Sequence, residues 1–432
     1  MRLNVLLLSN QVRGIDGTGG LGDVAVGLAK ALLSRGDVNI RLAMPGYIDI
    51  TENQKLRNRF NRTRLLRGLE GLPVPFGSAS ERVEVFEIQV PECHPAVICY
   101  LFRCPPVFDA REPETDYSAK VVYRHEQTLA KPKADRLDLL RATRAHFGQL
   151  FMVYEDSGEV DSLLGVARQA PPAIEVTDEY GVLHRVWQVS DSGLIDSVRS
   201  RMQDKKLIIA DGHHRYETAI TYRNERRSQS GAASTSAPYE YAMMTFLNMN
   251  SPGLLILPTH RVVHGLSSFS PGTFLASSRN LFEVQELDPA LDAARATAIL
   301  REHSSSGTAL LAVLADRALL LKSVKSAGSQ LLAGLSERQR ALDVVQLHKC
   351  LLEGVLELSE ESIRNQQNIS YVRDAAEAVA QVRGGKANLA FLMNPCRIQQ
   401  VRDVAFAGEV MPQKSTDFYP KLLSGLTVSA LE

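Results

Sequence analysis

The chain is short of cysteine, has no excess of either charge and contains no long apolar run. Five cysteines in 432 residues, an odd number without a C-x-x-C pair, argue against a disulfide framework and a zinc site. The 49 basic residues balance 49 acidic ones, whereas a general binder of nucleic acid or anionic membranes usually has a basic excess. No stretch approaches the roughly 20 apolar residues of a membrane span, and the apolar start is too short for a signal peptide. We therefore expect a cytoplasmic protein that takes a small-molecule substrate, with no membrane or nucleic-acid partner; its oligomeric state is left open.

What is present is the composition of an ordinary globular protein, with 44% hydrophobic and 23% charged residues. The length suffices for two or three domains, each with its own core. We place a domain boundary between residues 117 and 118, where the chain becomes polar and charged. Elements of both kinds alternate on either side of it, so the expected fold class is α/β, with an α+β arrangement in the C-terminal part.

The most informative stretch is DGHHRYETA, residues 211–219. It follows the apolar, β-branched run Leu207–Ile209 and opens a segment with helical spacing, which indicates a strand, a tight turn and a helix. Gly212 would let the backbone approach a ligand closely, and the N–H groups of a new helix form an anion site. The guanidinium of Arg215 suits phosphate oxygens, and His213 and His214 can donate further hydrogen bonds.

These features predict a phosphate-binding turn, with two alternatives. An Asp-Gly turn can cap a helix without any ligand. A metal site of Asp211, His213 and His214 is less favoured, because neighbouring residues in a tight turn seldom converge on one ion.

The string DGHHRYETA resembles the signature of a bacterial family known as domain of unknown function 1015. In this motif that family is similar to the ParB/sulfiredoxin-like superfamily, which includes free L-serine kinases. The resemblance implies a mixed α/β domain in which the loop from Asp211 to Arg215 holds the phosphates of a donor. Asp211, His213 and His214 would then belong to the catalytic centre.

The same family resemblance continues at the string RHE, residues 124–126, and in the charged segment after it. Glu126 lies beside Arg124 and His125, a basic neighbourhood that keeps a carboxylate ionised and able to accept a proton. Lys133 and Arg136 follow within two helical turns and could screen a polyphosphate. A solvated charged loop that leads into a helix over 135–147 is the alternative.

Two later strings also resemble the family. PTHR, residues 258–261, places His260 and Arg261 at the end of an expected strand, where they could neutralise phosphate; a structural histidine is the alternative. MPQKST, residues 411–416, places the ammonium of Lys414 beside the hydroxyls of Ser415 and Thr416, a set that suits phosphate. It is not a Walker motif, because the preceding glycines are absent.

The N-terminal part reads as a strand over 3–8, a glycine-rich loop, a helix over 24–36 and a second strand over 40–44. This is a truncated, Rossmann-like βαβ unit with its loop at the carboxyl edge of the sheet. The stretch 18–24, TGGLGDV, resembles the start of bacterial glycogen and starch synthases, which implies that Thr18, Gly19 and Gly20 meet a nucleotide sugar. The lysine that contacts the ADP-glucose phosphates in that family is Gly17 here.

The leading functional hypothesis is phosphoryl transfer to a small hydroxylated metabolite, with free L-serine as the candidate that the resemblance implies. ATP, ADP or pyrophosphate would be the donor, and Mg²⁺ would accompany it. Glu126 would take the hydroxyl proton, and Lys414–Thr416 with Arg261 would neutralise charge. Three alternatives stay open: glycosyl transfer from ADP-glucose, a nucleotide- or nucleic-acid-binding module of the ParB type, and an inactive fusion.

Overall fold

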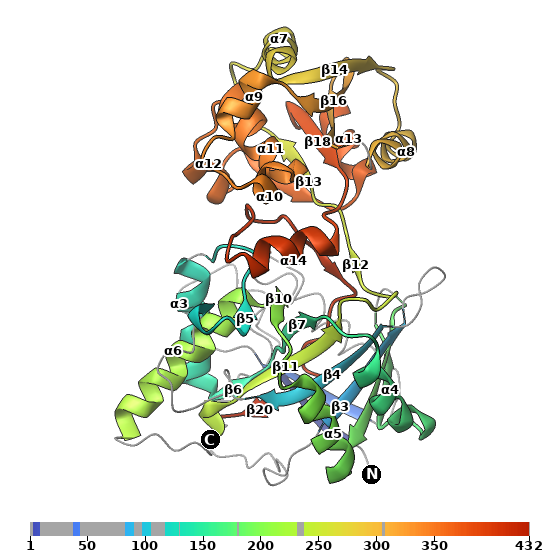
Figure 1. The fold of residues 1–432 in the computed structure, drawn as a ribbon, viewed down its shortest axis with the longest axis vertical. Helices are drawn as coiled ribbons and strands as arrows, with labels where there is room; N and C mark the ends of the chain where they lie inside the picture. The colour runs from blue at the N-terminus through green and yellow to red at the C-terminus, as the bar shows by residue number, and fades with distance from the viewer. Residues whose placement is uncertain are drawn as a thin grey trace. The chain divides into compact units, whose positions relative to one another are not determined.

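The chain forms two units. The computed structural model describes residues 3–8, 38–43, 83–89, 97–104, 117–128, 130–178, 181–230, 237–304 and 307–431 (Figure 1). The first unit consists of residues 1–122, 128–254 and 420–432, and the second consists of residues 123–127 and 255–419. Both units combine sheets with helices, which confirms the mixed α/β class predicted from the sequence.

Two parallel strands stand at the start of the first unit. β1 (Leu3–Leu8) pairs with β2 (Val38–Ala43), from Leu3 opposite Val38 to Leu8 opposite Ala43. This parallel pair agrees with the predicted βαβ start. The glycine-rich loop with Thr18, Gly19 and Gly20, and the helix predicted after it, lie outside the described residues.

Eight strands form the main sheet of the first unit, in the order β5-β10-β7-β11-β4-β3-β9-β8. From β10 to β8, β7 and β11 run parallel and every other neighbouring pair is antiparallel. The sheet contains strands from both sides of residue 117, and the boundary between residues 117 and 118 stays a prediction. The strands are β3 (Val83–Gln89), β4 (Val97–Cys104), β5 (Val122–Tyr123), β7 (Leu150–Tyr154), β8 (Ile174–Thr177), β9 (Leu183–Val189), β10 (Leu207–Asp211) and β11 (Ala242–Asn248).

The centre of this sheet is covered by helices. β7 and β11 are buried along their whole lengths, which explains why both are nearly continuous apolar runs rather than alternating ones. Side chains of α4, α5 and α6 pack in the core that covers the sheet, and α3 lies beside α6 (Figure 1), where Arg141 pairs with Glu225 at 2.6 Å. The remaining elements are η1 (Tyr117–Ala119), α3 (Ala130–Thr143), β6 (Ala145–His146), α4 (Glu159–Gly165), η2 (Val166–Gln169), α5 (Ser192–Met202), α6 (His213–Ser230), η3 (Pro238–Glu240) and β20 (Ser429–Ala430).

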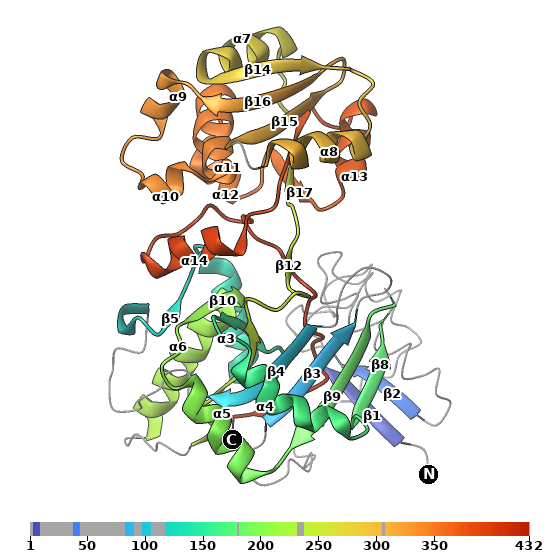
Figure 2. The same ribbon diagram turned by 45° about the vertical axis from the view of Figure 1, so that its right-hand side comes forward.

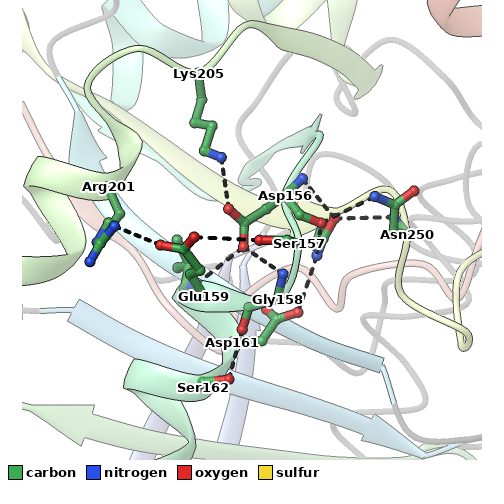
Figure 3. A network of polar contacts seen from close by, with 11 residues as sticks. Asp156, Ser157, Gly158, Glu159, Asp161, Ser162, Arg201, Lys205 and Asn250 are labelled. Carbon is green, nitrogen blue, oxygen red and sulfur yellow. Dashed lines mark hydrogen bonds and ion pairs between the residues drawn. The ribbon is translucent and has the colours of Figure 1, made fainter.

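A polar network joins the ends of β7 and β11 (Figure 3). The buried carboxylate of Asp156 accepts the N–H groups of Gly158 at 2.9 Å and Val160 at 3.3 Å, and the ammonium of Lys205 at 2.7 Å. Asn248 donates to the carbonyl of Asp156 at 3.0 Å. These contacts satisfy the N–H groups at the start of α4, so the network has a structural role.

The second unit is built on a six-stranded sheet in which every neighbouring pair is antiparallel, in the order β14-β16-β15-β18-β13-β17. A short antiparallel pair, β12 and β19, lies apart from it. The strands are β12 (Leu255–Ile256), β13 (His260–Val263), β14 (Phe282–Leu287), β15 (Ala309–Leu314), β16 (Ala318–Val324), β17 (Ile369–Val372), β18 (Leu389–Met393) and β19 (Phe418–Tyr419).

Helices cover both faces of this sheet (Figure 2). Alternate residues of β18 point to opposite faces: Ala390 and Leu392 pack with α8 and α13, whereas the ring of Phe391 lies 6.0 Å from that of Phe274 in α7. None of the described helices is long and apolar enough to cross a membrane. The helices are α7 (Pro271–Leu281), α8 (Ala293–His303), α9 (Ser326–Leu331), α10 (Glu337–Arg340), α11 (Asp343–Gln346), the π-helix η4 (Leu347–Val355), α12 (Glu360–Arg364), α13 (Ala375–Arg383) and α14 (Ile398–Phe406).

Candidate functional site

The segment DGHHR forms the predicted turn between a strand and a helix. β10 ends at Asp211 and α6 begins at His213, with Gly212 between them. Gly212 has a φ of +103°, in the region that disfavours every residue with a side chain. A Cβ at this position would lie 2.9 Å from Nη2 of Arg215. Glycine is therefore required both by the backbone conformation and by the close approach of Arg215.

Three cations gather around one carboxylate at this turn. Nη2 of Arg215 donates to Oδ2 of Asp211 at 2.9 Å. Burial opposes ionisation of Asp211, but the charges of Arg215 and Lys421 outweigh it and hold the pKa of this carboxyl well below its usual range. Burial and repulsion from Arg215 lower the pKa of Arg136 to about 10, so its guanidinium is charged at neutral pH. The carboxylate of Asp135 also acts on Arg136, so the cluster of Arg136, Arg215, Lys421 and Asp211 keeps a positive excess of three cations over two carboxylates.

This cationic cluster lies at the N-terminus of a long helix. α6 has 18 residues and no acidic residue in its first turn, so its N-terminal dipole is not offset by its own side chains. Nε of Arg215 is buried and has no hydrogen-bond partner among the described residues. A helix N-terminus, a positive excess and an unmatched guanidinium N–H together suit an anion such as phosphate.

Glu217, one helical turn further along α6, holds Lys133. Its Oε2 accepts from Nζ of Lys133 at 3.0 Å and from the hydroxyl of Thr128 at 2.8 Å, and its Oε1 accepts from the hydroxyl of Tyr117 at 3.1 Å. Burial would raise the pKa of Glu217, but the hydrogen bonds from Lys133 and Thr128 lower it. The ammonium of Lys133 is therefore matched by a carboxylate, and its predicted contact with phosphate stays a prediction.

Three histidines belong to the same region of the first unit. His213 is buried and His214 is half-buried at the start of α6, and the carbonyl of His214 accepts the hydroxyl of Thr218 at 2.8 Å. Burial and the charge of Arg215 lower the pKa of His146 to about 4, so this imidazole is neutral at pH 7. The catalytic roles predicted for His213 and His214 stay predictions.

In the second unit, the loop Lys414–Thr416 wraps around Glu126. Oε1 of Glu126 accepts the N–H of Ser415 at 3.0 Å, and the N–H and the hydroxyl of Thr416, both at 3.2 Å. Lys414 has a φ of +59°, the left-handed conformation that turns successive N–H groups toward one point. The loop forms an anion-binding concavity whose occupant here is the carboxylate of Glu126, and the phosphate contacts predicted for Lys414, Ser415 and Thr416 stay predictions.

His125 supports this loop. Its imidazole is fully buried, and Nε2 lies 2.7 Å from the hydroxyl oxygen of Thr416. Thr416 has one hydroxyl proton, which it donates to Glu126, so Nε2 of His125 must be the donor in the shorter bond. Arg124, before it in the chain, is exposed. The hydrogen bond from His125 to Thr416 thus orients the hydroxyl of Thr416 so that it donates to Glu126.

His260 and Arg261 begin strand β13 rather than ending one. Nδ1 of His260 accepts the N–H of Met393 at 3.3 Å, and burial, with the charge of Arg261, lowers the pKa of His260 to about 4. Nη2 of Arg261 donates to the carbonyl of Lys414 at 3.0 Å. The structure therefore groups Arg261, Glu126 and the loop Lys414–Thr416 in the second unit, and Arg136, Arg215 and Asp211 in the first.

The fold and these two clusters define a mixed α/β protein with a glycine turn suited to an anion. The chain belongs to the family described as "Protein of unknown function (DUF1015)", whose model matches residues 112–345, more than half of the chain. A second model, the starch synthase catalytic domain, matches residues 4–142. No curated protein matches the chain.

Solved structures are similar to the chain at low identity. A free serine kinase variant in complex with AMP is 12% identical, with a TM-score of 0.38 over 72% of this chain and 89% of that chain. A variant of a free serine kinase in complex with ADP is 11% identical, with a TM-score of 0.38 over 80% and 95%. A conserved hypothetical protein from Pyrococcus furiosus is 12% identical, with a TM-score of 0.37 over 72% and 92%. The bound AMP and ADP belong to the kinase structures.

The sequence motifs assign no role to three residues in or near the cationic cluster, namely Lys421, Glu217 and His146. Lys421 belongs to the string FYPKL near the end of the chain, and its charge reaches Asp211 only through the fold. Glu217 lies within the DGHHRYETA motif, two residues after Arg215, and this nearness was the available signal. His146 lies within the helix predicted over 135–147, whereas α3 ends at Thr143 and His146 belongs to β6. Nothing in the sequence singles this residue out.

Proposed function

We propose that this chain transfers a phosphoryl group from a nucleotide or pyrophosphate to a small hydroxylated metabolite, with free L-serine as the candidate acceptor. The observation that carries the proposal is the Gly212 turn at the start of α6, where the cations Arg136, Arg215 and Lys421 outnumber the carboxylates of Asp211 and Asp135. Phosphoryl transfer needs positioning and charge stabilisation more than covalent chemistry, and this cluster supplies both.

The reaction requires three events. The acceptor hydroxyl oxygen forms a bond to the terminal phosphorus of the donor, the bond from that phosphorus to the bridging oxygen breaks, and the hydroxyl proton passes to a base. Glu126 is the candidate base. Its Oε1 is occupied by three donors, so the proton would go to Oε2.

Mg²⁺ would accompany the donor phosphates. Among the described residues, no group of three or more His, Cys, Asp or Glu side chains could hold a metal ion by itself. Magnesium in such sites is usually held by one or two carboxylates together with substrate phosphates, and the partly buried carboxylate of Asp211 lies beside the turn. Asp211 therefore fits a metal that enters with the donor, where the ion would neutralise developing phosphate charge.

Phosphorus NMR tests the proposal. The full chain is incubated with Mg²⁺ and L-serine and, in separate tubes, ATP, ADP or pyrophosphate. We expect a phosphomonoester signal with one donor that disappears in Arg215→Ala and persists in Arg199→Ala, an exposed arginine of α5. No phosphomonoester from any donor, with a protein shown to be folded, would reject L-serine phosphorylation.

Glycosyl transfer is a second candidate, favoured by the starch synthase model over residues 4–142 and by the parallel pair β1 and β2. Its test is the binding of ADP-glucose to the full chain. A Thr18→Val variant that loses this binding, with ATP binding unchanged, would support the glycosyl-transfer candidate; absence of ADP-glucose binding would remove it.

A further inference from the structure

Arg261 is a buried arginine whose hydrogen-bonding capacity is only partly used. Its side chain is 1% exposed. A guanidinium has five N–H groups. In Arg261 the two of Nη1 donate to the carbonyl of Thr259 and to the sulfur of Met393, and one of Nη2 donates to the carbonyl of Lys414. The Nε–H has no partner in the described part of the chain. One N–H on Nη2 and the Nε–H therefore remain to be matched.

The charge of Arg261 is also unmatched at close range. Its described contacts include no carboxylate ion pair; its guanidinium lies over the ring of Tyr371, with the central carbon 5.3 Å from the ring centroid. Burial lowers the pKa of Arg261, and Tyr371, Cys396 and Glu126 only partly offset it. A buried charge without a paired anion destabilises the folded state, so Arg261 lowers the stability of this unit unless an anion binds to it.

His348 provides a second unmatched group nearby. It is 6% exposed and lies on the π-helix η4. π-Helices are rare in proteins, and those that occur are often found at functional sites. Its Nε2 has no partner among the described residues. Burial, followed by the charge of Arg261, holds the pKa of His348 well below its usual range, so the imidazole is neutral.

We propose that the second unit binds a small carboxylic acid, whose carboxylate takes the unmatched Nε–H and Nη2–H of Arg261 and lies beside His348. A carboxylate offers two oxygens to a guanidinium fork. It also carries one negative charge, which matches the single charge of Arg261 beside a neutral imidazole, whereas a phosphate dianion would need a further cation. The ligand class therefore differs from the phosphate predicted for Arg261 from the sequence.

The carboxylate site does not depend on phosphoryl transfer. Only the identity of the ligand as a phosphoryl acceptor rests on the proposed function. If the chain transfers phosphoryl groups, the acceptor is a hydroxy acid or a hydroxylated amino acid. Binding measured without any phosphate donor separates the two, because failure of the transfer reaction leaves the binding result unchanged.

The test is calorimetric titration of the full chain with L-serine, with glycolate and with ethanolamine, which is L-serine without its carboxylate. We expect L-serine or glycolate to bind and ethanolamine to bind at least tenfold more weakly. This comparison uses the wild-type chain alone, so it does not depend on the folding of any variant. Equal affinity for L-serine and ethanolamine, or no binding of either carboxylate, would overturn the proposal.

Two variants then locate the site. Arg261→Lys keeps the charge but lacks the fork, and we expect carboxylate affinity to fall at least tenfold. Arg364→Lys changes an arginine of the same unit whose side chain is 44% exposed, and it should leave affinity unchanged. Inorganic phosphate is the competitor. If phosphate displaces the bound carboxylate at a lower concentration than acetate does, Arg261 binds phosphate in preference to carboxylate. That result would overturn the proposal.

Discussion

Arg215 and Asp211 face each other across the Gly212 turn, with Nη2 of the arginine 2.9 Å from Oδ2 of the aspartate. The pair fixes the guanidinium beside the N-terminus of α6. It does not cancel the positive charge there, because Arg136 and Lys421 also act on the cluster. The turn thus keeps an ordered arginine and a positive excess together, which are the two properties that binding a phosphate requires.

Replacement of Gly212 by alanine should abolish this arrangement. The added Cβ would lie 2.9 Å from Nη2 of Arg215, at a φ of +103°. We expect a loss of roughly 1–3 kcal/mol in the free energy of unfolding and at least a tenfold loss of ATP or pyrophosphate affinity. Urea unfolding and calorimetric titration measure the two effects.

The matched control is Gly158→Ala. Gly158 has nearly the same φ, +101°, but a Cβ there would meet nothing within 4 Å. It should cost stability through backbone strain alone and leave phosphate affinity intact. Equal loss of affinity in both variants would show that Arg215 is not the reason for the effect.

Lys133 and Arg136 should behave differently, although the sequence places both as phosphate ligands. Lys133 is held by Glu217, whereas Arg136 is a half-buried cation whose charge interacts with those of Arg215 and Asp211. We expect Lys133→Met to change donor affinity less than threefold and Arg136→Met to reduce it at least tenfold. Titration of ATP into both variants decides this; the reverse order would move the phosphate site toward Glu217.

Asp156 should make stability depend on acid pH. Burial opposes its ionisation, but the hydrogen bonds from Lys205, Val160 and Gly158 outweigh burial and lower its pKa. A carboxyl with a depressed pKa stabilises the fold above its unfolded pKa, about 3.9, and loses this contribution as pH falls through the folded pKa. Asp156→Asn should therefore cost about 3 kcal/mol at pH 7 and less at pH 3.

Glu159→Gln in the same network is the control (Figure 3). Glu159 pairs with Arg201 at 2.7 Å, but both side chains are more than half exposed. We expect it to change the free energy of unfolding by less than about 1 kcal/mol. Urea titrations at both pH values compare the variants, and a pH-independent cost of Asp156→Asn would refute the assignment of its pKa.

Glu126 combines a structural and a proposed catalytic role that two variants can separate. Glu126→Gln keeps an oxygen for the N–H groups of Ser415 and Thr416 but cannot take a proton, so we expect a near-normal melting temperature and kcat reduced at least a hundredfold. Glu126→Ala removes the acceptor and should also lower the melting temperature. Unchanged turnover in Glu126→Gln would leave the residue with the structural role alone.

The local order around the turn could be predicted from the sequence. The β-branched run before Asp211 forms β10, and Gly212 ends it before α6, because both signals depend only on neighbouring residues. α6 extends to Ser230, and near its end the hydroxyl of Ser228 donates to the carbonyl of Asn224 at 2.9 Å.

Contacts between distant segments could not be predicted in this way. Lys421, near the end of the chain, helps to lower the pKa of Asp211. Glu126 accepts hydrogen bonds from Ser415 and Thr416, which follow it by 289 and 290 residues. The sequence indicated Arg261 as a charged residue at a strand end, whereas burial leaves it without a carboxylate partner. Each of these properties is created by tertiary packing.

The central claim is that the Gly212 turn binds phosphate, and calorimetric titration of ATP, ADP and pyrophosphate into the full chain with Mg²⁺ tests it most directly. The account predicts that at least one of the three binds, that Arg215→Ala weakens this binding at least tenfold, and that Arg199→Ala does not. Binding that is equally strong in wild type and Arg215→Ala, or no binding of any of the three, would contradict it.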